Sequence, residues 1–82
     1  MAVAPSDDEI ARAILGALVH SLKVPAGQWA PLMAVRQHAQ ADGVDPQDFP
    51  RGLQYAEAQA WIQYDPQQPS VGLTDAGYAA AP

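Results

Sequence analysis

The sequence predicts an α+β fold that is mainly α, with three helices followed by a β-hairpin and a short terminal helix. Before Ala60, apolar residues recur at the three- and four-residue spacing of amphipathic helices. After Ala60, aromatic and β-branched residues flank a proline-rich turn, which is typical of a hairpin. The length of 82 residues fits one domain. We expect residues 1–5 to form a flexible tail and residues 6–82 to form the domain.

The first helix is expected to begin after Ser6 and to end at Val24-Pro25. Ser6-Asp7-Asp8-Glu9 has the form of a capping box, and its acids suit the positive end of the helix dipole. One apolar face recurs every fourth residue, at Ile10, Ile14, Leu18 and Leu22. The wetter side is expected to carry Arg12, Gly16 and His20.

Proline and glycine mark the limits of the second helix. Gln28 and Trp29 form a brief extended segment in this prediction, and Pro31 suits the first helical turn, where its missing N–H costs nothing. Gly43 is a good left-handed residue for the helix end. The apolar face between these limits comprises Leu32, Val35 and Ala39.

The third helix is predicted from Phe49 to about Ala60, with Asp48 as its N-cap. A cap at Asp45 would place Pro50 where it breaks a backbone hydrogen bond. The expected buried face is Phe49, Leu53, Ala56 and Ala60, and the residues expected to point away are Gln47, Arg51, Gln54, Tyr55 and Ala58.

The hairpin is predicted to pair Trp61–Tyr64 with Val71–Leu73 across a loop at Asp65–Ser70. Thr74 is the expected N-cap of the terminal helix, which runs from Asp75 to about Ala81. Trp29 and Trp61 are expected to close a small core, because many of the apolar residues are alanines that bury little surface.

Two segments resemble winged-helix (winged helix-turn-helix) regulators of the bacterial MarR and PadR types. The run from Leu53 to Ile62 is similar to the end of a recognition helix, where a Gly-Trp-Ile sequence leads into the wing. Leu73-Thr74-Asp75-Ala76-Gly77 is similar to the Leu-Thr-x-x-Gly stretch that closes the wing, and in it Gly77 permits close backbone packing. The resemblance implies a three-helix bundle with a hairpin wing. Ala60 stands where the family has Gly, so this turn is made without an easy left-handed residue.

The resemblance also implies DNA readout by the third helix and the wing. Arginine pairs with guanine and glutamine with adenine, and an arginine late in the second helix reaches phosphate. The candidate nucleic-acid or partner contacts are therefore Arg36, Gln47, Arg51, Gln54 and Tyr55. Three acids, Asp45, Asp48 and Glu57, lie near them in sequence and repel phosphate, and the predicted wing loop has no Lys or Arg.

Charge decides the order of the functional hypotheses. The chain has four Lys and Arg against nine Asp and Glu, a net charge of −5, whereas DNA affinity depends on cations. We therefore expect a protein-interaction module first, with a protein partner or a homodimer, and a sequence-specific DNA-binding transcription regulator as the alternative. Tyr55 is the best candidate for an exposed aromatic anchor.

Other function classes find little support in these residues. The chain has no cysteine, and His20 and His38 lie in different predicted helices without further ligands at a suitable spacing. No nucleophile elbow and no glycine-rich phosphate loop is present. We expect no enzymatic activity, cofactor, metal or small-molecule substrate. The sequence has neither a signal peptide nor a membrane-spanning segment, so we expect a cytoplasmic protein.

Overall fold

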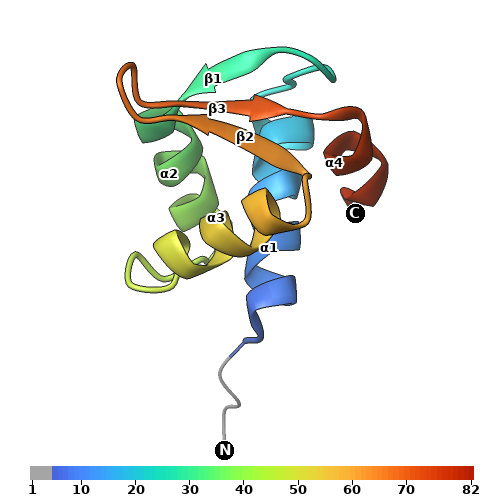
Figure 1. Ribbon diagram of the computed structural model, residues 1–82. Helices are drawn as coiled ribbons and strands as arrows, with labels where there is room; N and C mark the ends of the chain where they lie inside the picture. The colour runs from blue at the N-terminus through green and yellow to red at the C-terminus, as the bar shows by residue number, and fades with distance from the viewer. Residues whose placement is uncertain (1–4) are drawn as a thin grey trace, which may run out of the picture.

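The computed structural model describes residues 5–82, so residues 1–4 of the predicted tail lie outside the described part. The helices are α1 (Asp7–Gly16), continued by a π-helical turn η1 (Ala17–Ser21), then α2 (Leu32–Ala41), α3 (Phe49–Ala58) and α4 (Asp75–Ala80). The strands are β1 (Trp29–Pro31), β2 (Ile62–Asp65) and β3 (Ser70–Leu73). The prediction of a mainly α, α+β fold is confirmed (Figure 1). Within residues 5–82, no helix has the length and apolar character needed to cross a bilayer.

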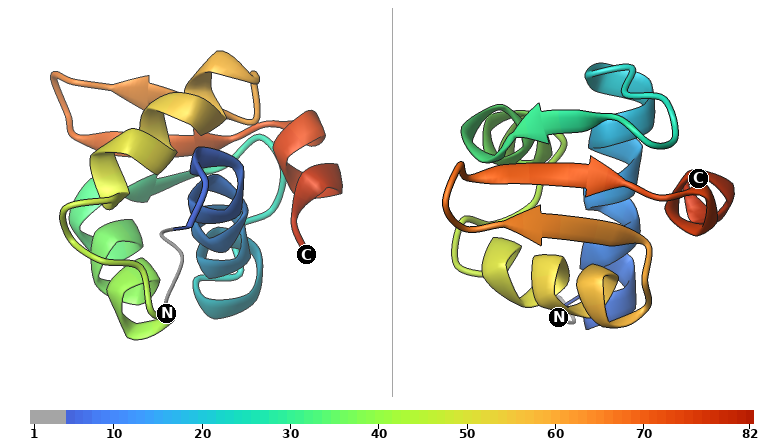
Figure 2. Two further views of the ribbon diagram at one scale, coloured as in Figure 1. Left: turned by 90° about the horizontal axis from the view of Figure 1, so that it is seen from below. Right: turned by 45° about the horizontal axis from the view of Figure 1, so that its top comes forward.

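The three strands form one antiparallel sheet in the order β1-β3-β2, which covers one side of the helices (Figure 2). The predicted hairpin is confirmed, with β2 displaced by one residue toward the turn and β3 longer by one residue at its start. The extended segment at Trp29 adds a third strand to it, and Pro31 ends this strand instead of starting the helix. The inner face of the sheet presents Ala30, Val71, Ile62 and Leu73, all buried.

The start of α1 agrees with the prediction. The Ser6 hydroxyl oxygen accepts a hydrogen bond of 3.2 Å from the Glu9 N–H, and Ile10, Ile14 and Leu18 are buried. The end of this helix departs from the prediction, because it widens into the π-helical turn after Gly16. Leu22 N–H donates to the Ala17 carbonyl five residues back, at 2.9 Å. The expectation that Gly16 lies on the wet side is wrong, since it is buried.

The α3 helix begins after Asp48 as predicted, so Pro50 lies within the first turn, but the Asp48 side chain makes no capping hydrogen bond. It ends at Ala58, short of the predicted Ala60, and Ala60 is exposed where a buried residue was expected. The residue that brings α3 close to α1 is Gly52: a Cβ added there would overlap the side chain of Ile10. Sequence analysis gave this glycine no role.

Helices α2 and α3 are each followed by a left-handed residue, and the same hydrogen-bond pattern closes both ends. Gly43 has φ of 102°, and Val44 N–H donates to the Ala39 carbonyl at 3.0 Å. Ala60 has φ of 61°, and Trp61 N–H donates to the Ala56 carbonyl at 2.9 Å. The prediction that the turn at Ala60 lacks an easy left-handed residue is confirmed, and an alanine carries the strain there.

The predicted cap of α4 is also confirmed. The Thr74 hydroxyl accepts a hydrogen bond of 3.0 Å from the Gly77 N–H. The same hydroxyl lies 2.7 Å from the Ala60 carbonyl oxygen and 2.8 Å from the Trp61 carbonyl oxygen, to which it donates. A Cβ on Gly77 would overlap the Trp61 carbonyl, so the close packing predicted for this glycine is present. Thr74 and Gly77 thus hold α4 against the start of the hairpin.

The left-handed strain at Ala60 predicts that Ala60→Gly stabilises the domain. Glycine removes the Cβ clash of the αL region, so we expect the free energy of unfolding to rise by about 1 kcal/mol. Chemical denaturation measures it. Ala58→Gly, at a right-handed helical position, is the control and is expected to lower the free energy of unfolding by roughly 0.5–1 kcal/mol. Equal effects of the two substitutions would contradict a left-handed Ala60.

The close approach at Gly52 predicts an effect opposite to helix propensity. Alanine is the better helix former by about 1 kcal/mol, yet Gly52→Ala is expected to destabilise by roughly 1–3 kcal/mol because the new methyl overlaps Ile10. Gly16→Ala is the control, since its Cβ would meet the Pro82 ring at an ordinary 3.6 Å. We expect this control to be neutral or stabilising. If Gly52→Ala instead raised the melting temperature in thermal denaturation, α1 and α3 would have to lie farther apart than this structure shows.

Candidate partner-binding surface

Arg51, a predicted DNA contact, is bound to carboxylates of the domain itself. Its Nε lies 2.5 Å from Asp7 Oδ1 on α1, and its Nη2 lies 3.4 Å from Asp48 Oδ1. The Arg51 Nη2 also donates to the Pro5 carbonyl at 3.4 Å. Arg51 therefore joins the start of α3 to the acidic first turn of α1.

Tyr55 lies one turn further along the same side of α3. It is half-buried, its hydroxyl donates to Asp8 Oδ2 at 3.3 Å, and its ring meets Trp61 edge-on with centroids 5.8 Å apart. The prediction that Tyr55 points away as an exposed anchor is therefore wrong. The physical reason is Gly52, whose missing side chain lets this side of α3 lie against α1.

Two of the five predicted contacts, Arg36 and Gln54, share a surface. They line a groove of about 420 Å³ between α2, α3 and β2, together with Leu32, Pro46, Phe49, Pro50, Leu53, Glu57 and Tyr64. The cation Arg36 and the anion Glu57 thus share this lining. Gln47 is absent from it and lies in the exposed turn before α3, where its N–H donates to Asp45 Oδ1 at 2.8 Å. The structure therefore separates the five residues into different surfaces.

Arg12 and Trp61 form an internal pair with a carboxylate. The Arg12 guanidinium lies 5.0 Å from the centroid of the Trp61 ring, and its Nε lies 2.8 Å from Asp8 Oδ1. Arg12 Nη1 also donates to the Ala80 carbonyl at 3.1 Å. Trp61 is half-buried and packs against the core, in agreement with its predicted role.

Trp29 is the large aromatic residue that the prediction misplaced. It was expected to close the core, but 49% of its surface is exposed. The alternation of β1 explains the error: Ala30 faces the core, so Trp29 lies on the outer face of the sheet. There it lies opposite Gly72 in the register of β3. A Cβ on Gly72 would lie 2.8 Å from the indole Cε2, so the ring covers this glycine closely.

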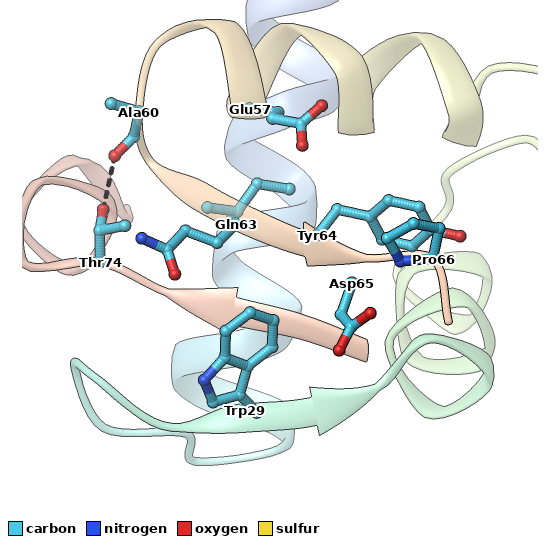
Figure 3. A pocket seen from close by; sticks show the side chains of 9 residues that line it. Trp29, Glu57, Ala60, Gln63, Tyr64, Asp65, Pro66 and Thr74 are labelled. Atoms are coloured by element: carbon cyan, nitrogen blue, oxygen red, sulfur yellow. Dashed lines mark hydrogen bonds between the residues drawn. The ribbon is translucent and has the colours of Figure 1, made fainter. Parts of the chain in front are cut away.

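A shallow groove of about 600 Å³ runs beside this indole, and we call it the indole groove (Figure 3). Two of its residues, Glu57 from the end of α3 and Asp65 from the end of β2, are acidic. Among the residues that line it there is no Lys or Arg; the full set is Trp29, Glu57, Ala60, Ile62, Gln63, Tyr64, Asp65, Pro66 and Thr74.

The position of the Asp65 carboxylate is set by the hairpin loop. Its Oδ1 accepts hydrogen bonds from Gln67 N–H at 3.0 Å and from Gln68 N–H at 3.4 Å. The register pairs Asp65 with Ser70 and Ser70 with Pro31, so Asp65 shares the outer face of the sheet with Trp29. Sequence analysis missed this surface. The alternation that puts Trp29 on the outer face is exposed–buried–exposed burial in the folded strand, and the sequence Trp29-Ala30-Pro31 has no apolar–polar alternation that signals it.

The contact between Trp29 and Gly72 predicts that Gly72→Ala displaces the indole. A methyl group at this position would lie within 3.0 Å of three indole atoms, so the ring must move outward. We expect increased acrylamide quenching of tryptophan fluorescence with nearly unchanged far-UV circular dichroism. The same substitution in a Trp29→Phe background, where Trp61 alone emits, is expected to leave quenching unchanged. A change in quenching in the Trp29→Phe background would show that Gly72→Ala disturbs the surroundings of Trp61 and would contradict a local effect on Trp29.

Comparison with protein-family models, curated protein sequences and solved structures found no match to this chain. The resemblance to winged-helix regulators therefore rests on the residues of the two motifs and on the order of the elements, and it remains a prediction.

Proposed function

We propose that this domain is a non-enzymatic binding module of winged-helix type whose ligand is a protein. The order of elements supports the winged-helix part: helix, short strand, two helices and a hairpin, with the short strand paired to the hairpin. The residues of the Leu-Thr-x-x-Gly motif support it too, since Thr74 caps α4 and Gly77 packs against the backbone of Trp61.

The observation that carries the choice of a protein ligand is the half-exposed Trp29 beside the indole groove. Tryptophan is one of the residue types, with tyrosine and arginine, that are enriched among the energetic centres of protein interfaces. The Trp29 ring lies closely over Gly72, so part of it already packs against the sheet before any partner arrives. Little side-chain entropy is then lost on binding, which favours affinity.

The alternative, a sequence-specific DNA-binding transcription regulator that reads DNA with α3 and the wing, is supported less well. Arg12 and Arg51 are each paired with carboxylates of the domain. Arg36 shares its groove with Glu57, and the hairpin turn between β2 and β3 consists of proline and glutamine residues. Phosphate binding requires cations that release counterions, and the α3 and wing surfaces offer few of them.

The proposal predicts weak DNA binding by the whole chain. In fluorescence anisotropy at low salt, we expect affinity for mixed-sequence duplexes no tighter than the roughly micromolar range of non-specific binding. Arg36→Ala is expected to change this affinity little. Tight binding that weakens steeply with salt and is lost in Arg36→Ala would support the DNA alternative instead.

The complementary measurement uses a photo-cross-linking amino acid at Gln63, which faces outward beside Trp29. In the cells that produce the protein, we expect a discrete protein adduct from this position. The same group at Gln37, exposed on α2, is the control and is expected to give no such adduct. Equal labelling from both positions, or none from Gln63, would count against a protein ligand at this surface.

A further inference from the structure

We infer that the indole groove binds an arginine side chain presented by a protein partner; this inference rests on the proposed function. The groove combines an exposed indole, two carboxylates and an apolar wall. These are the three features that recognise a guanidinium group, which stacks on aromatic rings, pairs with carboxylates and carries an apolar stem.

The domain itself contains one complete example of this recognition. At Trp61, the Arg12 guanidinium lies 5.0 Å from the ring centroid and 2.8 Å from an Asp8 carboxylate oxygen. Indole, guanidinium and carboxylate therefore come together at the surface of this fold. The lining of the groove beside Trp29 also includes an indole and the carboxylates of Glu57 and Asp65, while no cation is among the residues that line it.

The geometry of the groove suits a side chain that enters from outside. Glu57 approaches from α3, and Asp65 lies on the outer face of the sheet that also carries Trp29 (Figure 3). Pro66 adds apolar surface for the methylene stem of an arginine. The hydrogen bonds from the loop occupy Asp65 Oδ1, so Oδ2 is the oxygen that pairs with the guanidinium.

Recognition by a side chain is favoured over extension of the sheet. Trp29 and Pro31 occupy alternate positions of β1, and the residue before Trp29 bonds to β3, since Leu73 N–H donates to the Gln28 carbonyl at 3.0 Å. The outer edge of β1 is thus short and includes a proline, which has no N–H to donate to an added strand. Charge also disfavours a nucleic acid in this groove, because the carboxylates of Glu57 and Asp65 repel phosphate.

The test is a titration of the whole ¹⁵N-labelled chain with a short peptide that contains two arginines separated by glycines. The matched peptide has citrulline, which is isosteric and uncharged, in place of arginine. With the arginine peptide we expect chemical-shift changes at the Trp29 indole N–H and at the Gly72 and Gln63 amides. We expect none with the citrulline peptide. Shifts confined to other surfaces, or equal shifts with both peptides, would overturn the inference.

Three variants locate the interaction. Glu57→Gln and Asp65→Asn each remove one charge, and the asparagine retains the oxygen that the loop amides need. Each is expected to weaken peptide binding about two- to fivefold, as is Trp29→Ala. Glu9→Gln is the control because it removes the same charge at an exposed site on α1, and we expect little change from it. An effect of Glu9→Gln equal to that of Glu57→Gln would reduce the binding to general electrostatics and overturn the inference.

Cross-linking from Gln63 in the Asp65→Asn and Glu57→Gln variants distinguishes a failure of this inference from a failure of the proposed function. If the yield of the protein adduct falls in both Asp65→Asn and Glu57→Gln, both the inference and the proposed function stand. If the adduct persists undiminished in both variants, the groove binds a protein without an arginine, so the inference fails while the proposed function survives. If the adduct is a second copy of this chain, the groove joins two copies and the inference is overturned.

Discussion

The contact between α1 and α3 at Gly52 is the constraint on which most of the surface depends. Because this residue has no side chain, α3 lies directly on Ile10 and brings one of its sides against the acidic start of α1. Arg51 and Tyr55 then meet Asp7 and Asp8 instead of solvent. A larger residue at the contact would hold the helices apart and leave this arginine and this tyrosine available to an external ligand.

The junction between α3, the hairpin and α4 is the second point at which backbone geometry decides the fold. The left-handed conformation of Ala60 turns the chain from α3 into the hairpin. The Thr74 hydroxyl shares its hydrogen between the carbonyls of Ala60 and Trp61, and its oxygen accepts the capping hydrogen bond of α4. Gly77 lets α4 approach the Trp61 backbone. The same junction places Glu57, Ala60 and Thr74 in the lining of the indole groove, so the end of α3 also shapes the candidate site.

The two tryptophans show how the same side chain has different roles in a small domain. Trp61 is half-buried, with Arg12 and Tyr55 beside it, and its polar neighbours belong to the domain. Trp29 lies on the outer face of the sheet, with Gly72 beneath it and the carboxylates of Glu57 and Asp65 along the adjoining groove. The difference between them makes Trp29 the better candidate for contact with another molecule.

Local patterns determined the elements of this protein, because each depends on residues close in sequence. Ser6, Gly43 and Thr74 have the predicted capping roles, and the hairpin lies within a residue of its predicted position. The tertiary structure alone decided which side chains remain available. The exposure of Trp29, the burial of Tyr55 and the pairing of Arg51 depend on which helix or strand lies opposite, and Gly52 and Gly72 set those approaches by what they lack. A glycine carries no periodic signal of its own, so the close contacts of Gly52 and Gly72, which lie outside the motif that marked Gly77, become visible only when the chain is folded.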